Sequence, residues 1–380
     1  MSYTFIDKQK DFDELAAKLA KHKYLSIDTE SNSLYAYKEK FCLMQLSSEH
    51  INAVVDPLAV DIKALLPVFA DPAVEKIFHS ADSDIRVFKA SRRCVFENIF
   101  DVMVAAKYLG IIKCGLDSMV GEYFGVELNK KFQKADWGRR PLSKEMLDYA
   151  AGDTVYLKKL RDILGAELEK KGRLPEATAQ FAQICGVEPR AMHFDENGFL
   201  TLKGSRQLNG RGLAVLRELY LARELAAIKR DAPPFKVISE DLMLRLSVAP
   251  REGLHNLSIF KGVSSYVLAS HGVWIREALQ KGLKAQEYQV PRREISREKR
   301  AYFDSIKDRF KVLKLWRKET AVKRNMLPEA IMGNDVLERI ALAQPRSIED
   351  LKAVRGLSAE KLSLYGAEIM EFVKKHHPGK

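Results

Sequence analysis

The chain has 380 residues, more than a single hydrophobic core usually organises, so two or three domains are expected. Its hydrophobic content of 46% and charged content of 30% are typical of a folded globular protein and exclude a disordered one. The net charge of +12 is unevenly distributed: residues 1–200 hold 28 Lys and Arg against 30 Asp and Glu, whereas residues 201–380 hold 35 against 21. A basic second half favours a polyanionic partner, although basic surfaces also occur without one.

No apolar run approaches the roughly 18 residues of a membrane span. The first residues lack the basic region and apolar core of a signal peptide, so we expect a cytoplasmic protein with no membrane partner. The sequence does not fix the oligomeric state, and a monomer is the default expectation. The cysteines, Cys42, Cys94, Cys114 and Cys185, have long irregular spacings that match no zinc motif. Reduced thiols without a disulfide framework are expected.

The first half alternates apolar strands with amphipathic helices. Strands are predicted at 24–28, 43–47, 52–55 and 77–78. Helices are predicted at 11–21, 60–70, 83–90, 101–109, 116–124 and 143–171. The close spacing of the first three strands indicates an antiparallel meander in a mixed α/β domain. This half contains no glycine-rich phosphate loop, which excludes a P-loop nucleotide hydrolase.

After about residue 200 the pattern is helical and contains an internal repeat with an offset of 94 residues. Matching pairs include Lys229-Arg230 with Lys323-Arg324, Pro234 with Pro328, Asp241 with Asp335, Arg245 with Arg339 and Ile275 with Ile369. So many matches in one register, without a gap, predict two copies of one helical domain. Between the copies, residues 282–300 are polar and basic, with Pro291-Arg292-Arg293 at the centre, and are typical of a linker or an exposed turn.

Carboxylates from distant segments are the most informative feature of the first half. Asp28 ends an apolar strand, and Glu30, two residues on, points to the same face. Asp84 opens a helical stretch, where an acid also suits the positive end of the helix dipole. Tyr149 and Asp153 are four residues apart and share one face of a helix.

Each of these elements alone is commonly a helix cap or a solvated surface pair. Together, in this order, they favour a site for Mg²⁺ or Mn²⁺, which prefer oxygen ligands. Two such ions would activate an attacking water and neutralise a leaving 3′-oxygen, and a tyrosine hydroxyl could orient that water. Asp82 is a rival to Asp84. Asp101 and Gln45 are candidates for supporting positions.

Three segments resemble, in order, the motifs of the DEDD superfamily of 3′-5′ exonucleases, in its tyrosine-bearing branch, and are closest to the ribonuclease D family. They are SIDTE at 26–30, HSADSD at 79–84 followed by Val87-Phe88, and YAAGD at 149–153. The segment ADWGRRPL at 135–142 is similar to the family's DWxxRPL stretch. The helical repeats resemble tandem helicase-and-RNase-D C-terminal (HRDC) domains, the second copy being the more divergent.

The resemblance implies an α/β fold: an RNase H-like mixed-sheet exonuclease domain (1–205) followed by two all-α HRDC-type domains (206–290 and 291–380). Carried over by position, the two metal ions would be held by Asp28, Glu30, Asp84 and Asp153, and Tyr149 would orient the water. The related branch has a histidine near its last aspartate, where this chain has Tyr149, so the resemblance implies a structural role for His79. The implied activity is metal-dependent 3′-5′ exoribonuclease action that releases nucleoside 5′-monophosphates. The implied partners are RNAs with single-stranded 3′ ends, in particular tRNA precursors.

Arg139 and Arg140 could hold phosphates while Trp137 stacks, but a solvated turn around one tryptophan is nearly as good an interpretation. Two other functions remain open. A DNA exonuclease is possible because nothing in the sequence identifiably reads a 2′-hydroxyl. A non-catalytic nucleic-acid-binding protein is the other, and it would be expected to have lost one of the acids.

Overall fold

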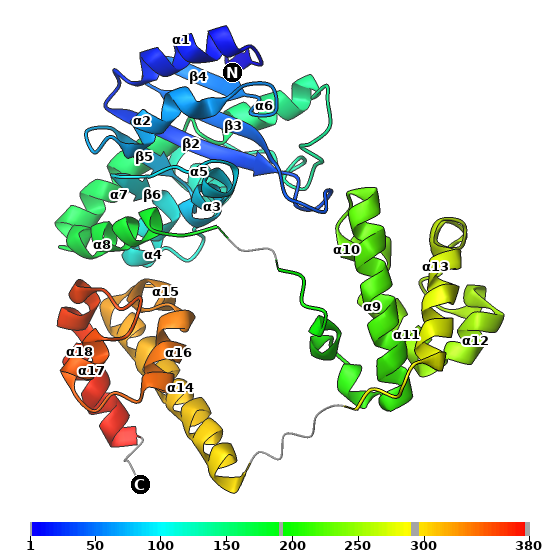
Figure 1. The fold of residues 1–380 in the computed structure, drawn as a ribbon. Helices are drawn as coiled ribbons and strands as arrows, with labels where there is room; N and C mark the ends of the chain where they lie inside the picture. Colours follow the sequence, from blue (N-terminus) through cyan, green and yellow to red (C-terminus); the bar gives the residue numbers. More distant parts are fainter. Residues whose placement is uncertain (1, 190–192, 290–295, 377–380) are drawn as a thin grey trace. The chain divides into compact units, whose positions relative to one another are not determined.

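The computed structural model describes residues 2–189, 193–289 and 296–376, which form two compact units (Figure 1). The first unit contains Met1–Glu30, Phe41–Pro189 and Glu294–Lys380, and the second contains Ser31–Lys40 and Arg190–Arg293. Phe199 belongs to the hydrophobic core of the second unit. The division at residues 205 and 290 inferred from the sequence remains a prediction. The centre of the predicted linker, Pro291-Arg292-Arg293, lies outside the described residues.

A six-stranded mixed sheet forms the centre of the first unit. In chain order its strands are β1 (Thr4–Ile6), β2 (Tyr24–Ser31), β3 (Phe41–Ser48), β4 (Ile51–Val55), β5 (Glu75–Phe78) and β6 (Ile99–Asp101). Their order in the sheet is β1-β4-β3-β2-β5-β6. Strands β3 and β4 are antiparallel, whereas β1 with β4, β2 with β5, and β5 with β6 are parallel. This arrangement confirms the predicted mixed α/β fold.

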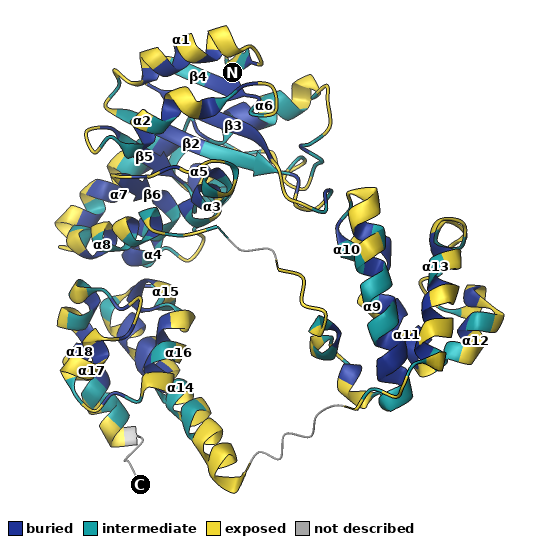
Figure 2. Ribbon diagram, viewed as in Figure 1, coloured by how far each residue is buried: buried dark blue, intermediate teal, exposed yellow. Residues whose placement is uncertain are grey.

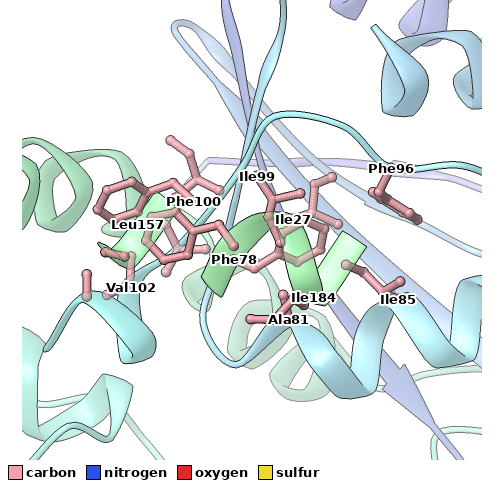
Figure 3. Packing of buried hydrophobic residues seen from close by; sticks show 14 of the residues in the cluster. Ile27, Phe78, Ala81, Ile85, Phe96, Ile99, Phe100, Val102, Leu157 and Ile184 are labelled. Atoms are coloured by element: carbon pink, nitrogen blue, oxygen red, sulfur yellow. The ribbon is translucent and has the colours of Figure 1, made fainter. Parts of the chain in front are cut away.

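The two faces of β2 have different roles. Leu25 and Ile27 are fully buried and belong to the main hydrophobic core. Side chains alternate along a strand, so Asp28 and Glu30 project from the opposite face. Ile27 packs beside Phe78 of β5 and Ile85 of a covering helix (Figure 3). The hydrophobic face therefore fixes the strand, and the fixed strand directs its carboxylates.

Helices cover this sheet, and burial is concentrated where they meet it. They are α1 (Gln9–Leu19), α2 (Leu66–Ala70), α3 (Ala81–Ser91), α4 (Val102–Leu109), α5 (Leu116–Phe124), α6 (Lys144–Gly152), α7 (Leu157–Lys170) and α8 (Leu174–Cys185), with a 3₁₀ turn at Ile62–Leu65. Figure 2 shows the central strands as largely buried and the outer helix faces as exposed. All eight residues of β3 are buried.

The structure corrects several predicted boundaries. The single helix expected at 143–171 is two helices, since α6 ends at Gly152 and α7 begins at Leu157. Asp153 therefore caps the end of α6 instead of lying inside a continuous helix. The three-residue strands β1 and β6 and helix α8 were not predicted from the sequence. No disulfide joins Cys42, Cys94, Cys114 and Cys185 in the described residues.

The repeat predicted for the second half is confirmed in the backbone. The first copy contains α9 (Gly210–Arg230), α10 (Pro234–Val237), α11 (Glu240–Val248), α12 (Pro250–His255) and α13 (Ser265–Lys284). The second contains α14 (Arg297–Arg324), α15 (Pro328–Ile331), α16 (Asn334–Ala343), α17 (Ile348–Lys352) and α18 (Ala359–His376). Gly262 and Gly356, 94 residues apart, both adopt positive φ angles, of 100° and 87°.

The second repeat packs on α4 and α8 within the first unit. Arg324 makes two hydrogen bonds to the carboxylate of Glu176, at 2.9 and 2.5 Å. The backbone amide of Leu327 donates to the carbonyl of Lys107 at 3.0 Å. Tyr365, which is 3% exposed, donates its hydroxyl to the same Glu176 at 3.3 Å. A buried polar network thus joins this repeat to the sheet-containing part of the chain.

Candidate active site

Three of the predicted acids converge between β2 and the end of α6. Asp28, Glu30 and Asp153 each offer a carboxylate oxygen, and these oxygens all lie within 4.8 Å of one another. Asp28 and Glu30 come from one face of β2, while Asp153 lies where α6 stops. Residues more than 120 positions apart in the chain thus form one cluster, as the sequence predicted.

Asp84 lies in the first turn of α3 beside this cluster and is 5% exposed. Its Oδ1 accepts a hydrogen bond of 2.5 Å from the hydroxyl of Thr29, the residue between the two acids of β2. Its rival Asp82 instead pairs with Arg86 at 2.7 Å on the surface of the same helix. The geometry therefore favours Asp84 over Asp82 as the fourth member.

The carboxylates are held where ionisation is unfavourable. Burial, followed by Asp28 and its neighbours, raises the pKa of Glu30 to about 10, and burial raises the pKa of Asp153 to about 7. Burial raises the pKa values of Asp28 and Asp84 well above their usual range, with further contributions from Asp153 and Asp28 respectively. A bound cation would offset both the cost of burying charged carboxylates and their mutual repulsion. This all-oxygen donor set fits Mg²⁺ or Mn²⁺.

Tyr149 lies on α6, one turn before Asp153. Its ring packs against Trp137 at 5.9 Å and against Phe132 at 6.0 Å between centroids. Burial, and then the charge of Asp153, raise the pKa of Tyr149 well above its usual value. The hydroxyl therefore stays protonated at neutral pH and can orient a water by hydrogen bonding rather than act as an anionic base.

Asp101 supports the turn that carries Asp84. Its carboxylate, which is 1% exposed, accepts backbone amides from Ser80 at 3.2 Å, Ala81 at 2.8 Å and Val104 at 3.0 Å. It therefore ties the beginnings of α3 and α4 together, while Ser80 adopts a left-handed φ of 72°. The supporting position anticipated for Asp101 is consistent with these contacts.

Other predicted residues have different environments. Burial lowers the pKa of His79, which favours the neutral ring and fits the expected structural role. Gln45 is fully buried on β3, and within the described part of the chain its side-chain amide has no hydrogen-bond partner. Arg140 forms an ion pair with Asp56 at 2.5 Å and bonds the carbonyl of Cys42 at 2.8 Å. This arginine therefore serves the fold, which supports the structural alternative for it.

A cavity of about 430 Å³ opens beside Tyr149 and Asp153. It is lined by Val126, Glu127, Leu128, Asn129, Lys131, Phe132, Glu145, Asp148, Tyr149, Gly152, Asp153 and Tyr156. The stretch 126–132 was not singled out from the sequence, because its short polar segment matches no motif. Because residues of this stretch line the cavity together with Tyr149 and Asp153, the cavity lies next to the carboxylate cluster.

Comparisons with known proteins agree with this geometry. A family profile described as 3′-5′ exonuclease matches residues 3–169, and an HRDC domain profile matches residues 306–373. A ribonuclease D from Granulibacter bethesdensis is 28% identical over 379 residues, covering 97% of this chain and 94% of the relative. The chain is a homologue of ribonuclease D, with matches to a 3′-5′ exonuclease domain and an HRDC domain. The HRDC match falls on the second repeat, which we expected to be the more divergent copy.

Solved structures extend the relationship. The catalytic core of RRP6 from Trypanosoma brucei superposes with a TM-score of 0.67 at 27% identity, covering 74% of this chain and 80% of that one. Ribonuclease D from Escherichia coli superposes over both full lengths with a TM-score of 0.69 at 22% identity, which supports the fold. Within the described residues, no helix is both long and apolar enough to span a membrane. With its 3′-5′ exonuclease domain and its ribonuclease D relatives, the chain is a 3′-5′ exoribonuclease.

Proposed function

We propose that Asp28, Glu30, Asp84 and Asp153 hold two divalent metal ions and that this site removes nucleotides one at a time from the 3′ ends of structured RNAs, among them tRNA precursors. The convergence of three carboxylates within 4.8 Å, with their pKa values raised by burial, is the observation that carries the proposal. Carboxylates so placed repel one another unless a cation lies between them.

The side chains divide the work of hydrolysis. When bound, divalent cations would lower the pKa of an attacking water and neutralise the leaving 3′-oxygen. The Tyr149 hydroxyl would direct that water by a hydrogen bond, and the rings of Trp137 and Phe132 would hold the hydroxyl in place. The cavity that includes Lys131 and Phe132 would receive the terminal nucleotide. A nucleoside 5′-monophosphate and an RNA shorter by one residue would leave.

A 3′-extended tRNA and a DNA oligonucleotide of matching sequence test the proposal. Each would be incubated with the wild type and with Asp28→Asn, in Mg²⁺, in Mn²⁺ and in chelator. We expect the wild type to shorten the RNA only when metal is present and Asp28→Asn to be strongly impaired. Equal degradation by the variant would refute the metal site, and degradation of the DNA alone would refute the choice of RNA.

A further inference from the structure

The two helical repeats share a sharp turn between their first and second helices, which lies outside the exonuclease motifs. In each, the long first helix ends in a residue with a left-handed backbone, Asp231 (φ 45°) or Asn325 (φ 46°). A short proline-initiated helix follows, Pro234–Val237 or Pro328–Ile331. We call residues 224–237 and 318–331 the first and second capped corners. Their positions differ by 94 residues, so they are equivalent surfaces that can be compared directly.

The second capped corner is a buried attachment. Arg324 pairs with Glu176 of α8 at 2.5 Å, and their side chains are only 28% and 9% exposed. Arg173 donates to the backbone carbonyl of Asn325 at 3.2 Å and to that of Tyr108 at 2.7 Å. Breaking a buried pair of this kind leaves an unpaired charge in the interior, so this corner is expected to stay attached.

The first capped corner holds another segment of the chain, residues 31–40. The backbone amide of Tyr37 donates to Oδ1 of Asp231 at 3.1 Å, and Lys40 pairs with Oδ2 of the same carboxylate at 3.1 Å. The Lys40 and Asp231 side chains are 52% and 56% exposed. Ion pairs with this exposure contribute little to stability and are screened by other charges.

Two further contacts belong to this attachment. The hydroxyl of Tyr37 donates to the carboxylate of Glu224 on α9, and the ammonium of Lys236 on α10 lies 3.4 Å from the centre of the Tyr35 ring. The hydrogen bonds from Tyr37 to Asp231 and from Lys40 to Asp231 are exposed, and the Tyr37–Glu224 bond is partly buried; none of them lies in an apolar core. Equivalent corners thus make a firm attachment in the second repeat and a weak one in the first.

We propose that the first capped corner is a releasable latch, a contact that holds residues 31–40 and can open. RNA bound to the first helical repeat would open it. The segment follows directly on Glu30, so its release or capture acts on the strand that carries Asp28 and Glu30. A polyanion favours release because its phosphates compete with Asp231 for Lys40. Lys229 and Arg230, in the last turn of α9, add to the attraction at the same corner.

Amide hydrogen exchange on the full-length protein tests the latch. The backbone amide of Tyr37 donates a hydrogen bond to the side chain of Asp231, so opening the latch exposes this amide to exchange. The informative variant is Asp231→Gly, since glycine suits the left-handed backbone and removes only the carboxylate. Asn325→Gly is the matched control, because the second corner uses the backbone carbonyl of that residue. Measurements would be made in chelator, with and without a 3′-extended tRNA, so that the RNA stays intact.

We expect Asp231→Gly to speed exchange in residues 31–40 by about fivefold, the size typical of a weak surface contact, and the control to leave it unchanged. Saturating RNA should raise exchange in the wild type toward the level of the variant. Unchanged exchange in Asp231→Gly would refute the latch, and unchanged or slower exchange on adding RNA would refute its release. The RNA arm rests on the proposed function, which is tested separately by shortening of the same RNA in Mg²⁺.

Discussion

Asp153→Asn should stabilise the metal-free protein while removing its activity. Asp153 is partly buried beside Asp28 and Glu30, and its pKa is raised from 3.8 to about 7. Ionising it in the absence of a cation therefore costs free energy that an uncharged amide of nearly the same shape avoids. The prediction separates the free-energy cost of placing these carboxylates close together from their role in hydrolysis.

The sign and size follow from linkage. A carboxyl whose pKa is higher in the folded state contributes stability that is complete below its unfolded pKa and is lost as the pH rises through about 7. The interval from 3.8 to about 7, at about 1.4 kcal/mol per unit, corresponds to a loss of about 4 kcal/mol by pH 8. This is an upper limit, because neighbouring acids share the penalty. The amide at position 153 of the variant does not titrate, so the stability advantage of the variant over the wild type should grow over that interval.

Thermal unfolding in chelator at pH 5 and pH 8 measures the effect. We expect the Tm of Asp153→Asn to exceed that of the wild type by several degrees at pH 8 and by much less at pH 5. Asp148→Asn is the control, since Asp148 lies on the same helix but is exposed and paired with Lys144 at 2.9 Å. Adding Mg²⁺ should stabilise the wild type more than Asp153→Asn. A variant no more stable than the wild type at pH 8 in chelator would refute the reasoning.

Three other changes give distinct outcomes. Tyr149→Phe should lower kcat by about 10- to 100-fold, with little change in KM, because only the hydrogen bond to water is lost; an equal rise in KM would point to substrate binding instead. Arg324→Ala should reduce the free energy of unfolding by about 3 kcal/mol, because Glu176 is left buried without its partner; denaturant unfolding checks this, and Glu176→Gln in the same background should recover part of the loss. Asp101→Ala should destabilise the protein by about 2–4 kcal/mol, since three backbone amides, one of them fully buried, lose their acceptor. A loss below about 0.5 kcal/mol would contradict its role.

The sequence predicts best where one pattern is repeated over a long stretch. The 94-residue offset located both helical copies, and the structure matches it at Asp231 and Asn325. The alternation along β2 correctly placed Asp28 and Glu30 on one face. Such features depend on local periodicity, which every residue in the stretch reinforces.

Features that depend on tertiary contacts were missed. Strands β1 and β6 have three residues each, too few to show a period, and exist through their pairing with β4 and β5. The break after Gly152 was not predicted because the apolar pattern continues in phase from α6 into α7. The contact between Asp231 and Tyr37 joins residues 194 positions apart, a separation that no local pattern reports.

The opposite faces of β2 link correct folding to a working site. A slip of one residue in the pairing of this strand would send Leu25 and Ile27 outward and turn Asp28 and Glu30 into the apolar core. Two carboxylates enclosed by hydrocarbon would make that misfolded form highly unstable. The proposed metal ligands Asp28 and Glu30 thus also act against this misfolded form. In any molecule with a stable sheet, both carboxylates already face the proposed site.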